Sequence, residues 1–201
     1  METLTAALAF LQQPWLAVPI CVAVVAGLWW RLGPWTAVYV ALMPIINWSF
    51  AAVPTFPIAE SLGGGRFQPL AIVTGLVLVA RDFAQREIGH RVLGAMFVGL
   101  ALSTLTSWIT VVVASGLAFL ISESVDWAVY TLSRRPLSQR IVVSSALSAP
   151  LDQTVFIWLA SSVLPGIFAW GTVLTGIASK LIGALVVALV VARQERAAAA
   201  R

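Results

Sequence analysis

The chain has 201 residues, of which 60% are hydrophobic and only 10% are charged. An average soluble protein is about 45–50% apolar and about 25% charged, so a soluble fold of this size could not hide so much apolar surface. In a soluble domain, a net charge of +4 would suggest nucleic-acid binding. Here the basic residues lie in short loops between apolar runs, where they set the orientation in the membrane. The composition therefore predicts an integral membrane protein, with no nucleic acid as a partner.

Seven apolar runs approach the roughly 20 residues that one helical crossing needs. They cover residues 13–30, 35–53, 68–88, 92–109, 112–131, 141–163 and 168–192. The break between the fourth and fifth runs rests on length alone, since 92–131 is too long for one span. A backbone that spans a membrane must satisfy its own hydrogen bonds, so it forms either helices or a closed β-barrel. The apolar runs lack the period-two alternation of a barrel, so we predict an all-α fold. The expected architecture is a single polytopic helical bundle over residues 1–201, with seven transmembrane helices, or six if 13–30 lies on the membrane surface.

The basic residues predict how the chain is oriented. Nine of the twelve Lys and Arg residues fall in alternate connections and the C-terminal tail: Arg31, Arg86, Arg91, Arg134, Arg135, Arg140, Arg193, Arg196 and Arg201. Only Arg66 falls on the other side. The positive-inside rule then places the C-terminus in the cytoplasm.

Six charged residues lie within the predicted spans, where each costs at least about 2.5–3.5 kcal/mol at the bilayer centre. They are Arg81, Asp82, Glu123, Asp126, Asp152 and Lys180. Intramembrane charges are functional candidates by default. At a rise of 1.5 Å per residue, Asp152, Lys180 and the polar Asn47 lie about 17–18 Å from the ends of their spans, near the midplane. The acids Asp82, Glu123 and Asp126 lie about 8–12 Å from the cytoplasmic ends.

Helical spacing predicts which of these groups can pair. Glu123, Asp126 and Tyr130 are three and four residues apart and form one stripe. Arg81 and Asp82 point about 100° apart, so we expect that they do not satisfy each other. Arg81 is then expected to pair with Glu123, and Asp82 with Arg86 one turn later. Asp152 and Lys180 are either a structural buried pair or recognition groups, and the second is favoured because buried pairs stabilise little.

These residue types suit a small, flat, polar substrate. A carboxylate accepts two parallel hydrogen bonds from a guanidine-like edge, and Lys180 or Asn47 can donate to carbonyl or nitrile acceptors. Aromatic rings that could stack on such a substrate are Trp48, Trp127, Tyr130 and Trp158. His90 is the only histidine and Cys21 the only cysteine, so we expect no metal site, no cofactor and no enzymatic activity.

Three segments resemble the vitamin uptake transporter-like family, whose members are regarded as queuosine precursor transporters. They are GLVLVARDFAQREIGHR (75–91), AFLISESVDWAVYTLSRR (118–135) and SSALSAPLDQTVFIWLA (144–160). The resemblance covers about residues 36–192. It implies a multi-span inner-membrane protein that imports 7-deazaguanine bases, such as preQ0 or preQ1, for tRNA modification.

The resemblance also implies site residues. By position, its three motifs fall on Arg81, Asp82 and Gln85, on Glu123, Asp126 and Tyr130, and on Ser148, Asp152 and Thr154. Family members often carry Asn where this chain has Ser145, which leaves the ligand open. Their usual count is six spans, so the apolar run at 13–30 leaves the N-terminal topology open.

Several functional classes stay open. A proton-coupled carrier would use Asp152 or Glu123 as its acid, whereas a passive facilitator would rely on consumption of the substrate inside the cell. The chain could instead be the substrate-binding membrane subunit of a multi-subunit ATP-driven vitamin importer. A non-transporting scaffold would pair all its buried charges and have no pocket. Membrane lipid is an expected partner in each case, and homo-oligomerisation is left open.

Overall fold

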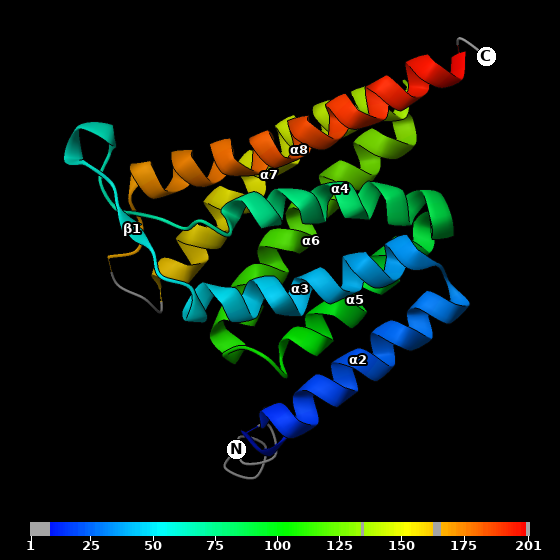
Figure 1. The fold of residues 1–201 in the computed structure, drawn as a ribbon. Coiled ribbons are helices and arrows are strands. Elements are labelled where there is room, and N and C mark those ends of the chain that lie inside the picture. The colour runs from blue at the N-terminus through cyan, green and yellow to red at the C-terminus, as the bar shows by residue number, and fades with distance from the viewer. Residues whose placement is uncertain (1–8, 134, 163–165, 200–201) are drawn as a thin grey trace. The chain divides into compact units, whose positions relative to one another are not determined.

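The computed structural model describes residues 9–133, 135–162 and 166–199, without the side chains of Ala51 and Tyr130. These residues are almost entirely helical (Figure 1). The helices are α2 (Pro14–Arg31), α3 (Pro34–Ala52), α4 (Ala71–Ile88), α5 (Val92–Ser103), α6 (Ile109–Leu132), α7 (Leu137–Ser161) and α8 (Trp170–Ala199). Short 3-10 turns, η1 (Glu60–Leu62) and η2 (Gly89–Arg91), and two short strands, β1 (Phe56–Pro57) and β2 (Arg66–Phe67), connect them. The predicted all-α membrane fold class is confirmed.

Proline and glycine mark several helix boundaries. The helices α2 and α3 begin at Pro14 and Pro34, where the missing N–H is not needed and the fixed φ suits a first turn. Gly33 joins these helices with a φ of 128°, a conformation that a side chain would strain. The sequence boundaries at this turn therefore agree with the structure to within a residue or two.

Four described helices have the length and apolar composition to cross a membrane: α2, α6 over Ile109–Val129, α7 and α8. The other three, α3, α4 and α5, fall outside that set. The span predicted at 92–109 needs correction, because α5 ends at Ser103 and α6 already begins at Ile109. Twelve residues of helix rise only about 18 Å, against a hydrocarbon core of about 30 Å. Four successive backbone turn bonds over Thr104–Ser107 end the helix early.

The chain divides into two compact units. The first comprises Met1–Ala52 and Ala80–Val113, and the second comprises Val53–Val79 and Ala114–Arg201. The helices α4 and α6 contribute to both. The expectation of a single transmembrane domain stays a prediction.

In the first unit, α3 packs against α2 and against α5. Asn47 of α3 is buried, and its Nδ2 donates to the Ser103 hydroxyl of α5 at 3.0 Å. The Ser107 hydroxyl donates to the Asn47 carbonyl at 3.0 Å. Gly99 of α5 faces the Met43 side chain, which leaves no space for a larger residue there. Small and polar residues thus bring α3 and α5 close together, as is common between membrane helices.

In the second unit, α7 and α8 lie side by side and antiparallel (Figure 1). Contacts along the pair run from Ser138 with Glu195 at one end to Gln153 with Thr172 at the other. The N-terminal half of α4 also approaches α8 closely, at Gly75. A Cβ added at Gly75 would lie 2.9 Å from the Lys180 Cα, so only glycine fits this crossing.

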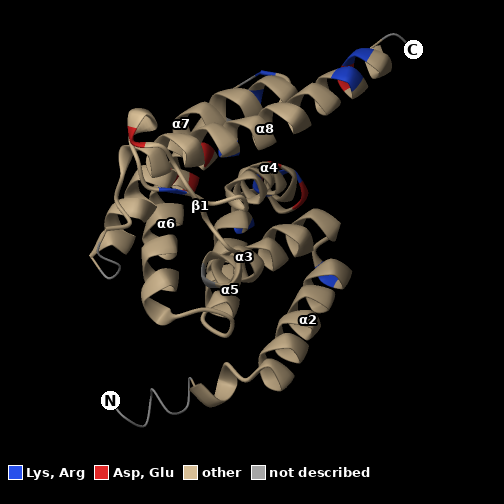
Figure 2. Cartoon of the chain, turned by 60° about the vertical axis from the view of Figure 1, so that its left-hand side comes forward, with Lys and Arg blue, Asp and Glu red and all other residues tan. Residues whose placement is uncertain are grey.

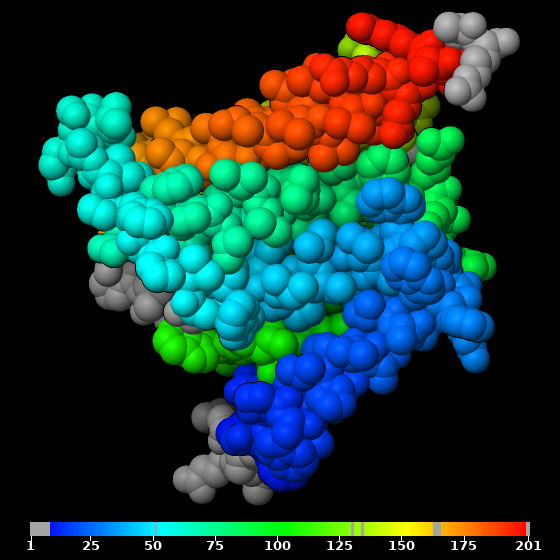
Figure 3. All heavy atoms as spheres, viewed as in Figure 1, coloured from blue at the N-terminus to red at the C-terminus, as the bar shows by residue number. Residues whose placement is uncertain are grey.

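A hairpin covers the N-terminal end of α8 in the same unit (Figure 3). Its strands pair Phe56 with Phe67 and Pro57 with Arg66, where the sequence predicted only a long break over 54–66. Gly63, Gly64 and Gly65 all have positive φ, which makes the turn tight. The Gly171 N–H donates to the Gly63 carbonyl at 3.2 Å, and the Arg66 N–H donates to the Thr172 hydroxyl at 2.9 Å. The hairpin thereby satisfies groups in the first turn of α8.

Candidate functional site

All six charged residues predicted within spans are buried, with at most 4% of each exposed. Most other charges among the described residues lie at helix ends or in connections, as the C-terminal end of α8 shows in Figure 2. Four of these six residues belong to the second unit. They are the carboxylates Asp152, Glu123 and Asp126 and the cation Lys180. This unit therefore holds the larger part of the buried charge.

Asp152 and Lys180 form an ion pair between α7 and α8. The Lys180 Nζ donates to Asp152 Oδ2, and the Ser122 hydroxyl of α6 donates to Asp152 Oδ1 at 3.4 Å. One carboxylate therefore joins three helices. A carboxylate has about four acceptor positions and an ammonium has three donors, so both groups keep capacity for a further polar partner.

Two hydroxyls lie beside this pair on the same face of α7. Ser145 and Ser148 precede Asp152 by seven and four residues, which are two turns and one turn of a helix. Both are buried, and neither hydroxyl oxygen has a hydrogen-bond partner among the described residues. A buried hydroxyl without a partner costs about 1–3 kcal/mol, so each such group needs an explanation. We call Ser145, Ser148 and Asp152 the α7 polar face.

The helix α6 adds two acids to the same unit. Glu123 is 1% exposed and Asp126 is fully buried, and Ser122 precedes Glu123 directly. Their spacing places them on one side of α6, as the sequence predicted. The side chain of Tyr130, the third member of the predicted stripe, lies outside the described residues. Among the described residues, no group of three or more His, Cys, Asp or Glu side chains is arranged to hold a metal ion.

The first unit corrects one predicted pairing. Arg81 Nη1 lies 3.0 Å from Asp82 Oδ1, so these neighbours in α4 form an ion pair that helical geometry was expected to prevent. The long Arg81 side chain spans the 100° between the two positions, whereas the expectation considered only where each Cβ points. Arg86, the partner expected for Asp82, is exposed. The expected Arg81–Glu123 pair joins residues of different units and stays a prediction.

Glu87 has a role that sequence reasoning missed. Its Oε1 accepts the Trp35 N–H at 3.1 Å, and its Oε2 accepts the N–H and the hydroxyl of Thr36 at 2.8 and 2.9 Å. The carboxylate thus caps the first turn of α3, where a negative charge is favourable. The ring of Trp35 also stacks on Phe83, with centroids 4.4 Å apart. A cap supplied from 51 residues away has no local sequence signal.

The remaining predicted site residues belong to the first unit. Asn47 bonds within α3 and to α5, as described above, and Gln85 is 6% exposed. Trp48 is 53% exposed, so it is not enclosed. The predicted convergence of Asn47 with Asp152 and Lys180 involves both units and stays a prediction.

Comparison with known proteins identifies the family. Residues 66–193 match the family described as "Putative vitamin uptake transporter". The matched segment contains α4 to α7, most of α8, and every residue of the α7 polar face. No curated protein and no solved structure matches the chain. Because the match covers well over half of the chain, the protein belongs to the vitamin uptake transporter family.

Proposed function

We propose that the protein imports a queuosine precursor, a 7-deazaguanine base such as preQ0 or preQ1, across the inner membrane, with its C-terminus in the cytoplasm. The substrate binds at the α7 polar face and Lys180, with Glu123 and Asp126 of α6 contributing negative charge. The observation that carries this proposal is the pair of buried Ser145 and Ser148 hydroxyls, which have no partner among the described residues.

The chemistry of the base supports this assignment. A 7-deazaguanine presents a ring N–H and an exocyclic amine side by side, and these are two parallel donors that match the two oxygens of Asp152. A carbonyl oxygen adjoins the ring N–H and suits a donor such as the Lys180 ammonium. The hydroxyls of Ser145 and Ser148 can donate to further acceptors, including the nitrile of preQ0.

The ion pair alone does not separate a transporter from a scaffold. A membrane scaffold would also pair Asp152 with Lys180, because an unpaired buried charge is costly. It would gain nothing from burying two hydroxyls without hydrogen bonds one and two turns away. Family membership also favours transport over a scaffold.

Uptake by cells that lack their own transporter for these bases tests the proposal. Cells that express the chain should accumulate labelled preQ0 or preQ1, with queuine as a third labelled base. Adenine should not compete, because its edge lacks the carbonyl and the neighbouring ring N–H. Absence of uptake for all three bases, at confirmed membrane expression, would refute the substrate assignment.

The same cells separate a self-sufficient carrier from an importer subunit. We expect uptake when the chain is expressed without any ATPase partner. If uptake appears only with an added ATPase module, the chain is instead the membrane subunit of an ATP-driven importer.

A further inference from the structure

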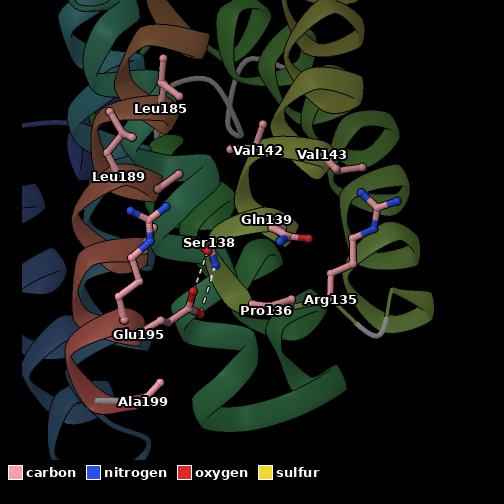
Figure 4. A pocket seen from close by; sticks show the side chains of 13 residues that line it. Arg135, Pro136, Ser138, Gln139, Val142, Val143, Leu185, Leu189, Glu195 and Ala199 are labelled. Atoms are coloured by element: carbon pink, nitrogen blue, oxygen red, sulfur yellow. Dashed lines mark hydrogen bonds between the residues drawn. The ribbon is translucent and has the colours of Figure 1, made fainter. Parts of the chain in front are cut away.

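An open groove runs between the start of α7 and the end of α8 (Figure 4). None of the residues that line it belongs to the α7 polar face. Its volume is about 610 Å³. Leu185, Leu189 and Val142 line its apolar part, while Arg135 and Arg196 line the other end. The whole groove lies within the second unit. We call it the basic groove.

The length of the groove along α8 matches the thickness of one leaflet. Val142, Leu185 and Leu189 are 42%, 50% and 55% exposed, so the groove presents an open apolar surface. Eleven residues separate Leu185 from Arg196 along α8, a rise of about 16 Å. One leaflet of a bilayer fills about half of a 30 Å hydrocarbon core. An acyl chain can therefore lie along this surface while its headgroup reaches the arginines.

The other end of the groove holds two arginines and one glutamate. Glu195 lies there too, but its carboxylate already accepts the Ser138 hydroxyl at 2.6 Å and the Ser138 N–H at 3.4 Å. Within the described residues, neither Arg135 nor Arg196 forms an ion pair through its guanidinium group, and both side chains are exposed. Two guanidinium groups outnumber the single Glu195 carboxylate at this end, and guanidinium binds a phosphate through paired N–H donors.

We propose that the basic groove binds an anionic phospholipid, with its headgroup phosphate at Arg135 and Arg196 and one acyl chain along Val142, Leu185 and Leu189. Basic pockets between membrane helices on the cytoplasmic side bind such headgroups in general. The inference does not depend on which substrate the protein carries, since none of these residues belongs to the α7 polar face.

Native mass spectrometry of the purified full chain tests the headgroup contact. The probes are dioleoyl phosphatidylglycerol, which is anionic, and dioleoyl phosphatidylcholine, which is zwitterionic. We expect phosphatidylglycerol to be retained preferentially, and Arg135→Gln with Arg196→Gln to lower its retention about tenfold or more. The matched control is Arg31→Gln with Arg91→Gln, which removes the same charge outside the groove and should change nothing.

A second pair of variants tests the apolar contact. Leu189→Trp should fill the groove and lower retention of phosphatidylglycerol, although both arginines are intact. Leu174→Trp is the control, because Leu174 is 58% exposed on the same helix and does not line the groove.

Three results would overturn the proposal. The first is equal retention of the two lipids, or equal losses in the groove and control variants. The second is displacement of phosphatidylglycerol by inorganic phosphate at the same sites, which would indicate a simple anion site. The third is a change in cross-linked dimer without a change in lipid retention, which would show that a second copy of the chain covers the groove.

Discussion

Lys180 of α8 donates a hydrogen bond to Asp152 of α7, 28 residues earlier in the chain, and both side chains are at least 95% buried. The predicted spans place both residues about 17–18 Å from the span ends, which predicts a position near the middle of the bilayer. Removing one partner leaves the other charge buried and unpaired, which lowers stability, whereas removing both charges leaves no unpaired charge. This asymmetry allows the structural role of the pair to be separated from its role in transport.

Lys180→Met should lower the stability of the protein by about 3–5 kcal/mol, because Asp152 would be left buried without its cation. Asp152→Asn combined with Lys180→Met should recover most of that loss, since no charge is then stranded. Thermal unfolding in detergent measures both effects. We expect the double variant to fold and yet take up no labelled preQ0. Normal uptake by the double variant would show that the pair is structural only.

Ser145→Ala and Ser148→Ala test the α7 polar face without removing a buried charge. Each removes a buried hydroxyl that has no partner among the described residues, so stability should stay the same or rise by up to about 1–3 kcal/mol. Substrate binding should weaken, and the concentration for half-maximal uptake should increase about tenfold, the equivalent of one hydrogen bond of about 1.4 kcal/mol. Ser161→Ala, at the half-buried last residue of α7, is the control and should have wild-type uptake. Unchanged uptake in both polar-face variants would remove the main support for a site there.

Gly75→Ala should destabilise the second unit, because the added Cβ would lie 2.9 Å from the Lys180 Cα and α4 would have to move away from α8. Overpacking of this kind costs about 1–3 kcal/mol. Gly94→Ala is the matched control in α5, where an added Cβ meets nothing within 4 Å. That variant should be neutral or more stable by about 0.5–1 kcal/mol, because alanine favours a helix. Equal thermal midpoints for the two variants would mean that the α4–α8 crossing is looser than described.

Glu87→Ala should cost about 1 kcal/mol, because the first turn of α3 loses the carboxylate that accepts its N–H groups. Arg86→Ala, at the preceding exposed position, removes a charge without a cap and should have little effect. The thermal midpoint of each variant distinguishes these outcomes. Equal effects of the two substitutions would rule out capping by Glu87.

Hydropathy predicted where most helices lie, because each apolar run must fold internally in a membrane. It did not predict the end of α5 at Ser103, since the residues up to Ile109 are apolar or weakly polar and carry no proline or glycine. The hairpin at residues 56–67 was also missed, because its strands are two residues long and the contact with Thr172 is distant in the sequence.

The cost of burying a charge singled out Asp152 and Lys180 in the sequence. Both residues are buried and form an ion pair, and their role in substrate binding stays a prediction. Positional reasoning failed for Arg81 and Asp82, because a flexible arginine can reach a neighbour that points elsewhere. Glu87 could not be found from spacing, since its partners are in another helix.

Uptake into liposomes that contain only the purified chain tests the central claim most directly. Labelled preQ0 should enter these liposomes saturably, preQ1 but not adenine should compete, and Asp152→Asn inserted in equal amount should abolish entry. Entry no faster than into empty liposomes, or equal entry with Asp152→Asn, would contradict the proposed transport through the α7 polar face.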